Sequence, residues 1–297
     1  MLINDPVSAF AGTIAKDIGA RLDPIPDGQI HRFDDPEGKR HNRACWYVIH
    51  LDGIPAGAYG NWRTGFQSTW RADTSRGLDP AEHARIDAML RAAREKRERE
   101  RLDNHTKASR RAAILWNDAV PATVGHPYLA RKRITALGLR QAGELLLVPL
   151  ADIGGNLLNL QKINPRGDKR FLSGGRITGC FALAGAQEIP EVGEVYIAEG
   201  WATASSIYQT LHVPVVAAMT AGNLLPVAQA IRARRPNLEI VVAADDDHRT
   251  PGNPGIRRAL EAASAVHGAV TWPTVCRQQN CECSDFNDAV NCERAPT

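Results

Sequence analysis

The segments VYIAEG (residues 195–200) and LEIVVAADDD (residues 238–247) each join a continuous apolar run directly to acidic residues. Such runs are typical of parallel strands that are buried on both faces. Open α/β sheets bind their ligands at the carboxyl edge, where these strands end. We therefore expect Glu199, Asp245 and Asp247 to meet at one sheet edge. Carboxylates that converge there repel one another unless a cation lies between them, and their oxygen atoms favour Mg²⁺ or Mn²⁺.

Strands and helices alternate around these two segments. The sequence predicts strands at residues 195–198, 213–219, 238–244 and 270–275, with intervening helices at 201–211, 224–234 and 253–267. Repeated βα units of this length specify an α/β domain with a parallel sheet and flanking helices. Asp285 and Asp288 follow the last strand. We assign Asp285 to the acidic edge, whereas Asp288 is left between that role and the capping of a helix over residues 286–291.

Three further parts precede this α/β domain, which we place at residues 191–297. We predict a small antiparallel β-rich module over residues 1–78, a charged helical linker over residues 79–115 and a mixed α+β basic subdomain over residues 116–190. Asp79-Pro80 opens the linker helix as an N-cap and a first-turn proline. Its long charge run favours a solvated face, with a track for nucleic-acid phosphates as the alternative.

The first module begins with a helix, after which the pattern turns to strands. A helix is expected over residues 6–18, and strands over residues 29–33, 45–51, 54–62 and 66–72. Asp52-Gly53 favours a tight hairpin turn between the second and third strands. Trp46, Tyr47, Trp62 and Trp70 lie on this sheet. Exposed aromatic side chains on a sheet stack unpaired bases, and we assign that role to Trp62 and Trp70; the alternative is that the tryptophans form the core of the module.

Composition sets broad limits on the chain. It has 297 residues, a net charge of +3 and six cysteines. No apolar stretch approaches the roughly 20 residues of a membrane span, and the N-terminus lacks a signal pattern. We therefore expect a cytoplasmic protein that does not enter a membrane and whose cysteines are reduced.

The cysteines fall into two groups. Cys276, Cys281, Cys283 and Cys292 are close in sequence, but their irregular Cys-x-Cys spacing favours scattered thiols, with zinc as the weaker alternative. Cys45 and Cys180 are expected to be small buried apolar residues.

The acidic segments, together with strand 213–219 and Ala221-Gly222-Asn223, resemble a Toprim domain. This metal-binding fold is shared by bacterial-type primases, topoisomerases, recombination-mediator proteins and certain nucleases. The resemblance covers residues 192–291. It implies that Glu199, Asp245 and Asp247 are catalytic acids that bind metal, with Asp285 as a further metal ligand.

The segments HPYLARKRI (126–134), LLLVPLADIGGNLLNLQKI (145–163) and GDKRFLSGG (167–175) resemble the basic subdomain that precedes Toprim in bacterial-type DNA primases of plasmids, phages and integrated elements. The resemblance implies a surface for template, nucleotides and growing RNA. Its positive charges would hold nucleotide or DNA phosphates: Lys162, Lys169, Arg170, Arg131 and Lys132. Any one of them alone is ordinary surface charge, but a basic turn beside an acidic metal site favours phosphate binding.

Three features depart from the pattern of these primases. Thr203 stands where many of them place a second acid, four residues after the Toprim glutamate. The first hundred residues contain only Cys45, so they cannot form the cysteine zinc ribbon that commonly reads the template. No GxxxxGK helicase motif follows the Toprim resemblance, so we expect a replicative helicase to act in trans.

The sequence thus predicts a DNA primase, a nucleotidyltransferase that makes short RNA primers on single-stranded DNA from nucleoside triphosphates with Mg²⁺ or Mn²⁺. It would serve the replication of a plasmid, phage or integrated element. One alternative is a Toprim-type nuclease that uses the same metals. The other is a catalytically silent nucleic-acid-binding accessory protein.

Overall fold

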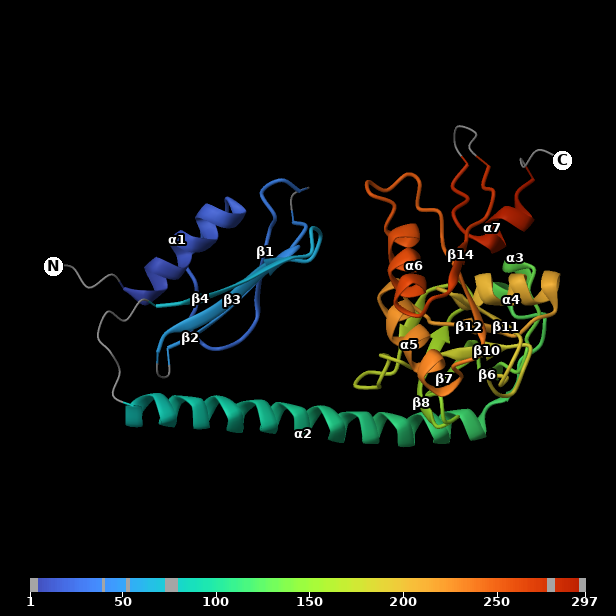
Figure 1. Ribbon diagram of the computed structural model, residues 1–297, viewed down its shortest axis with the longest axis horizontal. Helices are drawn as coiled ribbons and strands as arrows, with labels where there is room; N and C mark the ends of the chain where they lie inside the picture. The colour runs from blue at the N-terminus through green and yellow to red at the C-terminus, as the bar shows by residue number, and fades with distance from the viewer. Residues whose placement is uncertain (1–4, 39–40, 52–53, 73–79, 277–280, 294–297) are drawn as a thin grey trace. The chain divides into compact units, whose positions relative to one another are not determined.

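The computed structural model describes residues 5–38, 41–51, 54–72, 80–276 and 281–293 (Figure 1). The chain divides into two compact units, residues 1–97 and residues 98–297. The boundary lies inside the long helix α2 (Pro80–Asp118). The linker that we predicted at residues 79–115 therefore contributes to both units.

The first unit packs one helix on an antiparallel sheet. It contains α1 (Pro6–Ile18), β1 (His31–Phe33), β2 (Cys45–His50), β3 (Ala56–Asn61) and β4 (Phe66–Arg71), with the strands in sequential order. Asp5 caps α1, because its carboxylate accepts the backbone N–H of Ser8 at 3.1 Å. Phe10 and Ile14 of α1 are buried with Tyr47, Ile49 and Tyr59 of the sheet. The predicted Asp52-Gly53 turn and the Asp79 cap lie outside the described residues.

The second unit begins with an antiparallel sheet of five strands. They are β5 (Val120–Pro121), β6 (Arg140–Ala142), β7 (Leu145–Ala151), β8 (Leu157–Ile163) and β9 (Lys169–Phe171), and each pairs with the next. The short helix α3 (Pro127–Lys132) lies between β5 and β6 in sequence. β7 and β8 lie in the segment 145–163, which carries the resemblance to the primase subdomain.

The last part of α2 packs on one face of this sheet. Ala112 is buried together with Leu147, Leu160 and Leu172, and the Ser109 hydroxyl donates to the carbonyl of Leu157 at 2.7 Å. The charged residues of α2 keep the predicted solvated face, since Lys107, Arg110 and Arg111 are exposed even here. The contact with the sheet is made by alanine and serine on the other side of the helix.

The second unit continues with another five-stranded sheet, which has helices on both faces. Its strands are β10 (Ala182–Ala184), β11 (Glu194–Ala198), β12 (Val215–Ala217), β13 (Glu239–Ala243) and β14 (Ala269–Thr271), in the spatial order β10-β12-β11-β13-β14. The helices are α4 (Trp201–Leu211), the 3₁₀ turn η1 (Ala221–Asn223), α5 (Leu224–Arg234), α6 (Pro254–Ala265) and α7 (Phe286–Asn291).

The sheet differs from the expected one at its edges. β10 was not predicted and pairs antiparallel with β12, so the sheet is mixed, although its other pairings are parallel. β12 ends before Met219, which adopts a left-handed φ of 72°. β14 ends two residues before Pro273, which has no N–H for a strand ladder. The predicted strands 213–219 and 270–275 are therefore too long.

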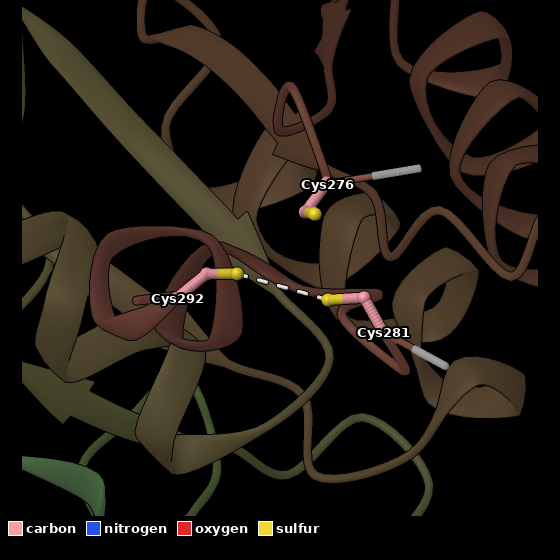
Figure 2. A group of neighbouring side chains, drawn as sticks. All are labelled: Cys276, Cys281 and Cys292. Carbon is pink, nitrogen blue, oxygen red and sulfur yellow. Dashed lines mark hydrogen bonds between the residues drawn. The ribbon is translucent and has the colours of Figure 1, made fainter. Parts of the chain in front are cut away.

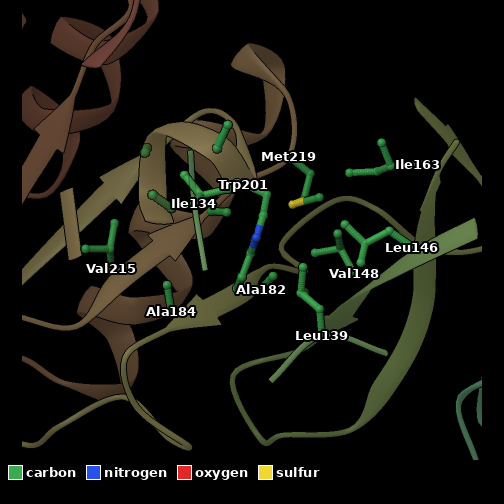
Figure 3. Close-up of a cluster of buried hydrophobic side chains, with 14 of the residues drawn as sticks. Ile134, Leu139, Leu146, Val148, Ile163, Ala182, Ala184, Trp201, Val215 and Met219 are labelled. Carbon is green, nitrogen blue, oxygen red and sulfur yellow. The ribbon is translucent and has the colours of Figure 1, made fainter. Parts of the chain in front are cut away.

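Two hydrophobic layers hold this sheet in place. Helices α5 and α6 cover one face with residues such as Val227 and Ala262, against Ile197 and Val242 of the strands. On the other face, Trp201 of α4 lies in a hydrophobic cluster that also contains Leu146 and other residues of the β5–β9 sheet (Figure 3). The two sheets of this unit therefore share one core, which fixes the β7–β9 region next to α4.

None of the helices in the described part of the chain combines the length and the apolar character that a membrane span requires.

Candidate active site

Glu199 and Asp245 leave neighbouring strands at the same sheet edge. Ala198 of β11 and Ala243 of β13 are partners in the parallel register. Glu199 follows the first of them directly, and Asp245 lies two residues after the second. The Glu199 carboxylate also accepts the backbone N–H of Ala221 at the start of η1. The predicted placement of these two acids at the carboxyl edge of the sheet is thus confirmed.

The acids at this edge disfavour one another's charged form. Burial raises the pKa of Asp245 to about 8, with further contributions from the charges of Glu199, Asp285 and Asp247. Burial, followed by the charge of Asp247, also raises the pKa of Glu199. One oxygen of Asp245, Oδ1, is buried and has no hydrogen-bond partner. An unpartnered carboxylate oxygen among mutually repelling acids fits a bound divalent cation, because the cation would supply the missing contact and compensate the charge.

Asp247 is turned partly toward the start of α6. The backbone N–H of Gly255 donates to its Oδ2 at 3.0 Å. Among the described residues, the carboxylate oxygens of Glu199, Asp245 and Asp247 do not form a group within 4.8 Å of one another. That the three meet around one divalent ion stays a prediction; in this structure the hydrogen bond from Gly255 directs one oxygen of Asp247 toward the start of α6.

Asp285 combines both roles that were considered for the later acids. As the N-cap of α7 it accepts the backbone N–H of Asp288 at 2.7 Å. Its carboxylate also interacts with the Thr203 hydroxyl, and its pKa is raised, first by burial. Asp285 in turn contributes to the raised pKa of Asp245. Thr203, which occupies the position of a second acid in many primases, is a buried neutral partner of this acid.

Asp246 connects the acidic loop to the segments that begin α6 and α7. It is 2% exposed, its Oδ1 accepts from Asn253 Nδ2 at 2.7 Å, and its backbone N–H donates to the carbonyl of Ser284 at 2.6 Å. These contacts fasten the Asp245–Asp247 loop to the starts of α6 and α7. Our sequence reasoning did not identify Asn253 or Ser284 as supports; the only local signal was Asn253-Pro254, which indicates a helix start.

Only part of the predicted basic group faces the acids. Ile163 pairs with Lys169, and Lys162 pairs with Arg170, across β8 and β9. Side chains alternate along a strand, so Lys169 shares the face of Ile163, which belongs to the core common to both sheets. Lys162 and Arg170 are on the opposite face, that of Leu160 and α2. The expectation that all three lie together beside the acids is therefore wrong.

Lys169 lies against the acidic edge, next to Glu199. An ideal Cβ on Gly200, next to Glu199, would stand 4.0 Å from its Nζ. Desolvation lowers the pKa of Lys169, and nearby Lys132 adds to this, while Asp285, Glu199 and Asp245 oppose it. The residue retains substantial solvent exposure, so a ligand can reach the ammonium group. At Gly200 itself a Cβ would have room.

Two other predicted cations are engaged within the protein. Lys132 Nζ donates to Asp288 Oδ1 at 3.0 Å. Desolvation opposes the charge of Lys132, but this hydrogen bond and the charge of Asp285 outweigh it and raise its pKa. Arg131 donates to the carbonyl of Pro165 at 3.1 Å and lies over the ring of Tyr128. Lys132 of α3 thus binds α7 through Asp288. Arg131 stabilises the turn that precedes Lys169 through its hydrogen bond to Pro165.

The two tryptophans assigned to template stacking behave differently. Trp62 is 55% exposed, and its ring lies 5.6 Å from that of Trp46, with both side chains outside the core. Trp70 packs against Phe10 of α1, with ring centroids 5.3 Å apart. The stacking role of Trp70 is therefore not supported, because its side chain completes the core of the first unit, and Trp46 accompanies Trp62 instead.

The four C-terminal cysteines lie together, so the expectation of scattered thiols is wrong. Sγ of Cys281 is 3.1 Å from that of Cys283 and 3.7 Å from that of Cys292. The predicted burial of Cys45 and Cys180 is confirmed, since both are 0% exposed.

Comparison with known proteins agrees with this architecture. Residues 194–294 match the family model of the Toprim domain, so the predicted Toprim domain is confirmed. Two proteins of Escherichia coli, each named DNA primase TraC, are 36% and 32% identical to this chain over 265 residues. Each alignment covers 86% of this chain, but 25% of the first relative and 18% of the second. The predicted resemblance to bacterial-type DNA primases is thereby confirmed, and the chain spans about a quarter or less of these relatives.

Among solved structures, the primase fragment of the bacteriophage T7 primase-helicase protein matches with a TM-score of 0.44 and 15% identity, over 59% of this chain and 72% of that one.

Proposed function

We propose that this chain is a DNA primase unit that joins ribonucleotides into short primers on single-stranded DNA. The proposal rests on one observation above others: Nζ of Lys169, from the sheet that precedes the Toprim domain, lies 4.0 Å from an ideal Cβ at Gly200, beside Glu199. There the charges of Glu199, Asp245 and Asp285 act on it. Nucleotidyl transfer needs positive charge on the phosphates opposite the acids that hold a divalent ion. The relatives named DNA primase TraC support the same assignment.

Glu199 and Asp245 are the residues that would hold Mg²⁺ or Mn²⁺, with Asp247 and Asp285 beside them. A bound divalent ion supplies charge neutralisation at the α-phosphate during in-line displacement. The chain itself contributes the positions of the oxygen ligands. Asp245 presents an oxygen without a hydrogen-bond partner, and Ala221 orients Glu199 through its backbone N–H.

Lys169 would draw the triphosphate to this edge. Its solvent exposure leaves the ammonium group accessible, and its location against the acids lets it contact phosphate oxygens that also approach the metal site. Lys132 has a different role, because its bond to Asp288 holds the loop that carries Asp285. Lys162 and Arg170 would contact the template or product strand from the opposite sheet face, where their charge is distant from the reacting phosphates.

The alternatives differ in their products. A Toprim nuclease would use the same acids and metal to shorten DNA, and an accessory protein would bind DNA without changing it. Lys169 favours synthesis, because a cation facing the acids suits a triphosphate substrate. A primase would act on cytoplasmic DNA whose template strand a helicase has opened.

A priming assay tests the proposal. The protein is incubated with single-stranded DNA templates of varied sequence, labelled nucleoside triphosphates and Mg²⁺. We expect labelled oligomers that disappear in Glu199→Gln, whereas Glu239→Gln, at the start of β13 and so at the other end of the strand, retains them. Shortened DNA without labelled oligomers would support the nuclease. DNA binding that is indifferent to Mg²⁺ and to Asp245→Ala, without any product, would support the accessory protein.

A further inference from the structure

Four thiols meet in a small region after β14. Sγ atoms of Cys276, Cys281 and Cys292 all lie within 4.8 Å of one another, and Figure 2 shows these side chains turned toward the same space. Cys283 adds a fourth sulfur, 3.1 Å from that of Cys281. Residues 277–280 lie outside the described part of the chain, so the cluster is defined by these four side chains alone.

The spacing of the sulfurs suits a tetrahedral metal ion. Four sulfurs that each lie about 2.3 Å from a zinc ion stand about 3.8 Å from one another. Cys281 and Cys292 are separated by 3.7 Å, which already matches. Cys281 and Cys283 would move apart by less than about 1 Å to reach the same separation. Their present distance is much longer than a disulfide bond of about 2.05 Å.

Hydrophobic packing does not account for this arrangement. Cys180 belongs to the core that the two sheets share. Cys276 and Cys281 are buried, at 4% and 6% exposure, but neither is a member of the hydrophobic clusters found among the described residues. Thiols are weak hydrogen-bonding groups, so four that mainly contact one another gain little by themselves.

The backbone around the cluster supports thiolate ligands. The N–H of Cys283 donates to Sγ of Cys281, and hydrogen bonds of this kind orient and stabilise metal-bound sulfur. Sγ of Cys283 also lies 3.7 Å from the carbonyl of Asp288. Cys292 follows α7 directly as its C-cap. The cluster therefore joins the end of the sheet to both ends of α7.

We propose that Cys276, Cys281, Cys283 and Cys292 bind one structural zinc ion. Binding converts the thiols to thiolates and releases their protons to solvent, and no redox change occurs. The ion would fasten the segment 281–292, on which Asp285 and Asp288 lie. This zinc site does not depend on primase activity; its consequence for catalysis, the positioning of Asp285, rests on the proposed function.

Metal analysis of the full chain, purified under reducing conditions without added chelator, tests the proposal. Mass spectrometry of the dissolved metal should find about one zinc per chain. Cys281→Ser and Cys292→Ser should lose it. Cys45→Ala, in the first unit, and Glu199→Gln, at the acidic edge, should retain it, which separates a thiolate site from zinc bound by carboxylates.

A second measurement uses the wild-type protein, so that it does not depend on whether the cysteine variants fold. Removal of zinc from the wild-type protein by a chelator should increase amide hydrogen exchange across residues 281–292, and added zinc should reverse the increase. Exchange in β11 and α4 should change little. Either of two results would overturn the proposal: wild-type protein that contains no zinc and cannot take it up, or a disulfide between any two of these cysteines in the reduced preparation. Both results are independent of whether priming is observed.

Discussion

The backbone N–H of Gly255 donates to Oδ2 of Asp247 at 3.0 Å, so an acid of the candidate active site also binds the first turn of α6. The same glycine lies against Asp245, because a Cβ at position 255 would stand 2.3 Å from the Asp245 carbonyl oxygen. The start of α6 thus sets the position of two acids through one residue. The cost of a side chain there would fall on both stability and catalysis.

Gly255→Ala is predicted to displace the Asp245–Asp247 loop. Overpacking of a close contact costs about 1–3 kcal/mol, and the carbonyl that must move belongs to a proposed metal ligand. We expect a lower free energy of unfolding in urea, and priming should require a higher concentration of Mg²⁺ because the metal site binds it more weakly. Gly200→Ala is the matched control, since a Cβ there meets nothing closer than Lys169 Nζ at 4.0 Å. Equal stability of the two variants would contradict the prediction.

The sequence was sufficient to predict the acidic edge, because two apolar runs that end in acid determine where buried parallel strands stop. It was not sufficient to predict which basic residues face that edge. The difference between Lys169 and the pair Lys162 and Arg170 is the face of the sheet on which their side chains lie. That face depends on the register between β8 and β9. A turn sequence of mixed charge does not determine that register.

The cysteine cluster could not be predicted for a related reason. The thiols meet because α7 is held against α3 and α4, through contacts such as Asn287 Nδ2 with the Lys132 carbonyl at 2.7 Å and with the Ser206 hydroxyl at 2.8 Å. These contacts join residues that are far apart in the chain. Spacing rules for zinc sites assume local loops, and here tertiary contacts bring Cys292 back.

Asp245 predicts a pH-dependent stability of the metal-free protein. Its pKa is raised from 3.8 to about 8, first by burial and then by the neighbouring acids. The folded state therefore binds a proton that the unfolded state releases between these two values, and the contribution of Asp245 to stability falls as pH rises through this window. This contribution to the free energy of unfolding is close to zero below about pH 4, and it is most destabilising above about pH 8.

Asp245→Asn should consequently be more stable than the wild type at pH 8 in the presence of EDTA, by at least about 1 kcal/mol, and similar to it near pH 4. Urea unfolding at both pH values measures this, with Asp118→Asn at the exposed end of α2 as control. Mg²⁺ should stabilise the wild type more than the variant. A stability difference that is independent of pH would show that the Asp245 carboxyl does not carry this penalty.

Lys169→Met should impair nucleotide incorporation far more than Lys162→Met. Both residues lie on paired strands of one sheet, and only Lys169 faces the acids. Loss of one charged donor to the reacting phosphates costs about 10²–10³-fold in rate. Lys162→Met should mainly weaken binding of the template, with an effect that added salt reduces. Steady-state incorporation at varied nucleotide concentration distinguishes the two, and equal losses would remove the special role of Lys169.

Trp62→Ala should weaken binding of single-stranded DNA without unfolding the first unit. Trp62 is 55% exposed and pairs with Trp46 outside the core, and stacking of one base on an aromatic ring contributes about 1–3 kcal/mol. Fluorescence anisotropy of labelled DNA measures the affinity, and Ile30→Ala, which removes a side chain that is 64% exposed in the same unit, is the control. Trp70→Ala should instead lower thermal stability, because its ring packs against Phe10. If Trp62→Ala binds DNA as the wild type does while Trp70→Ala stays folded and loses binding, the template contacts the other face of this sheet.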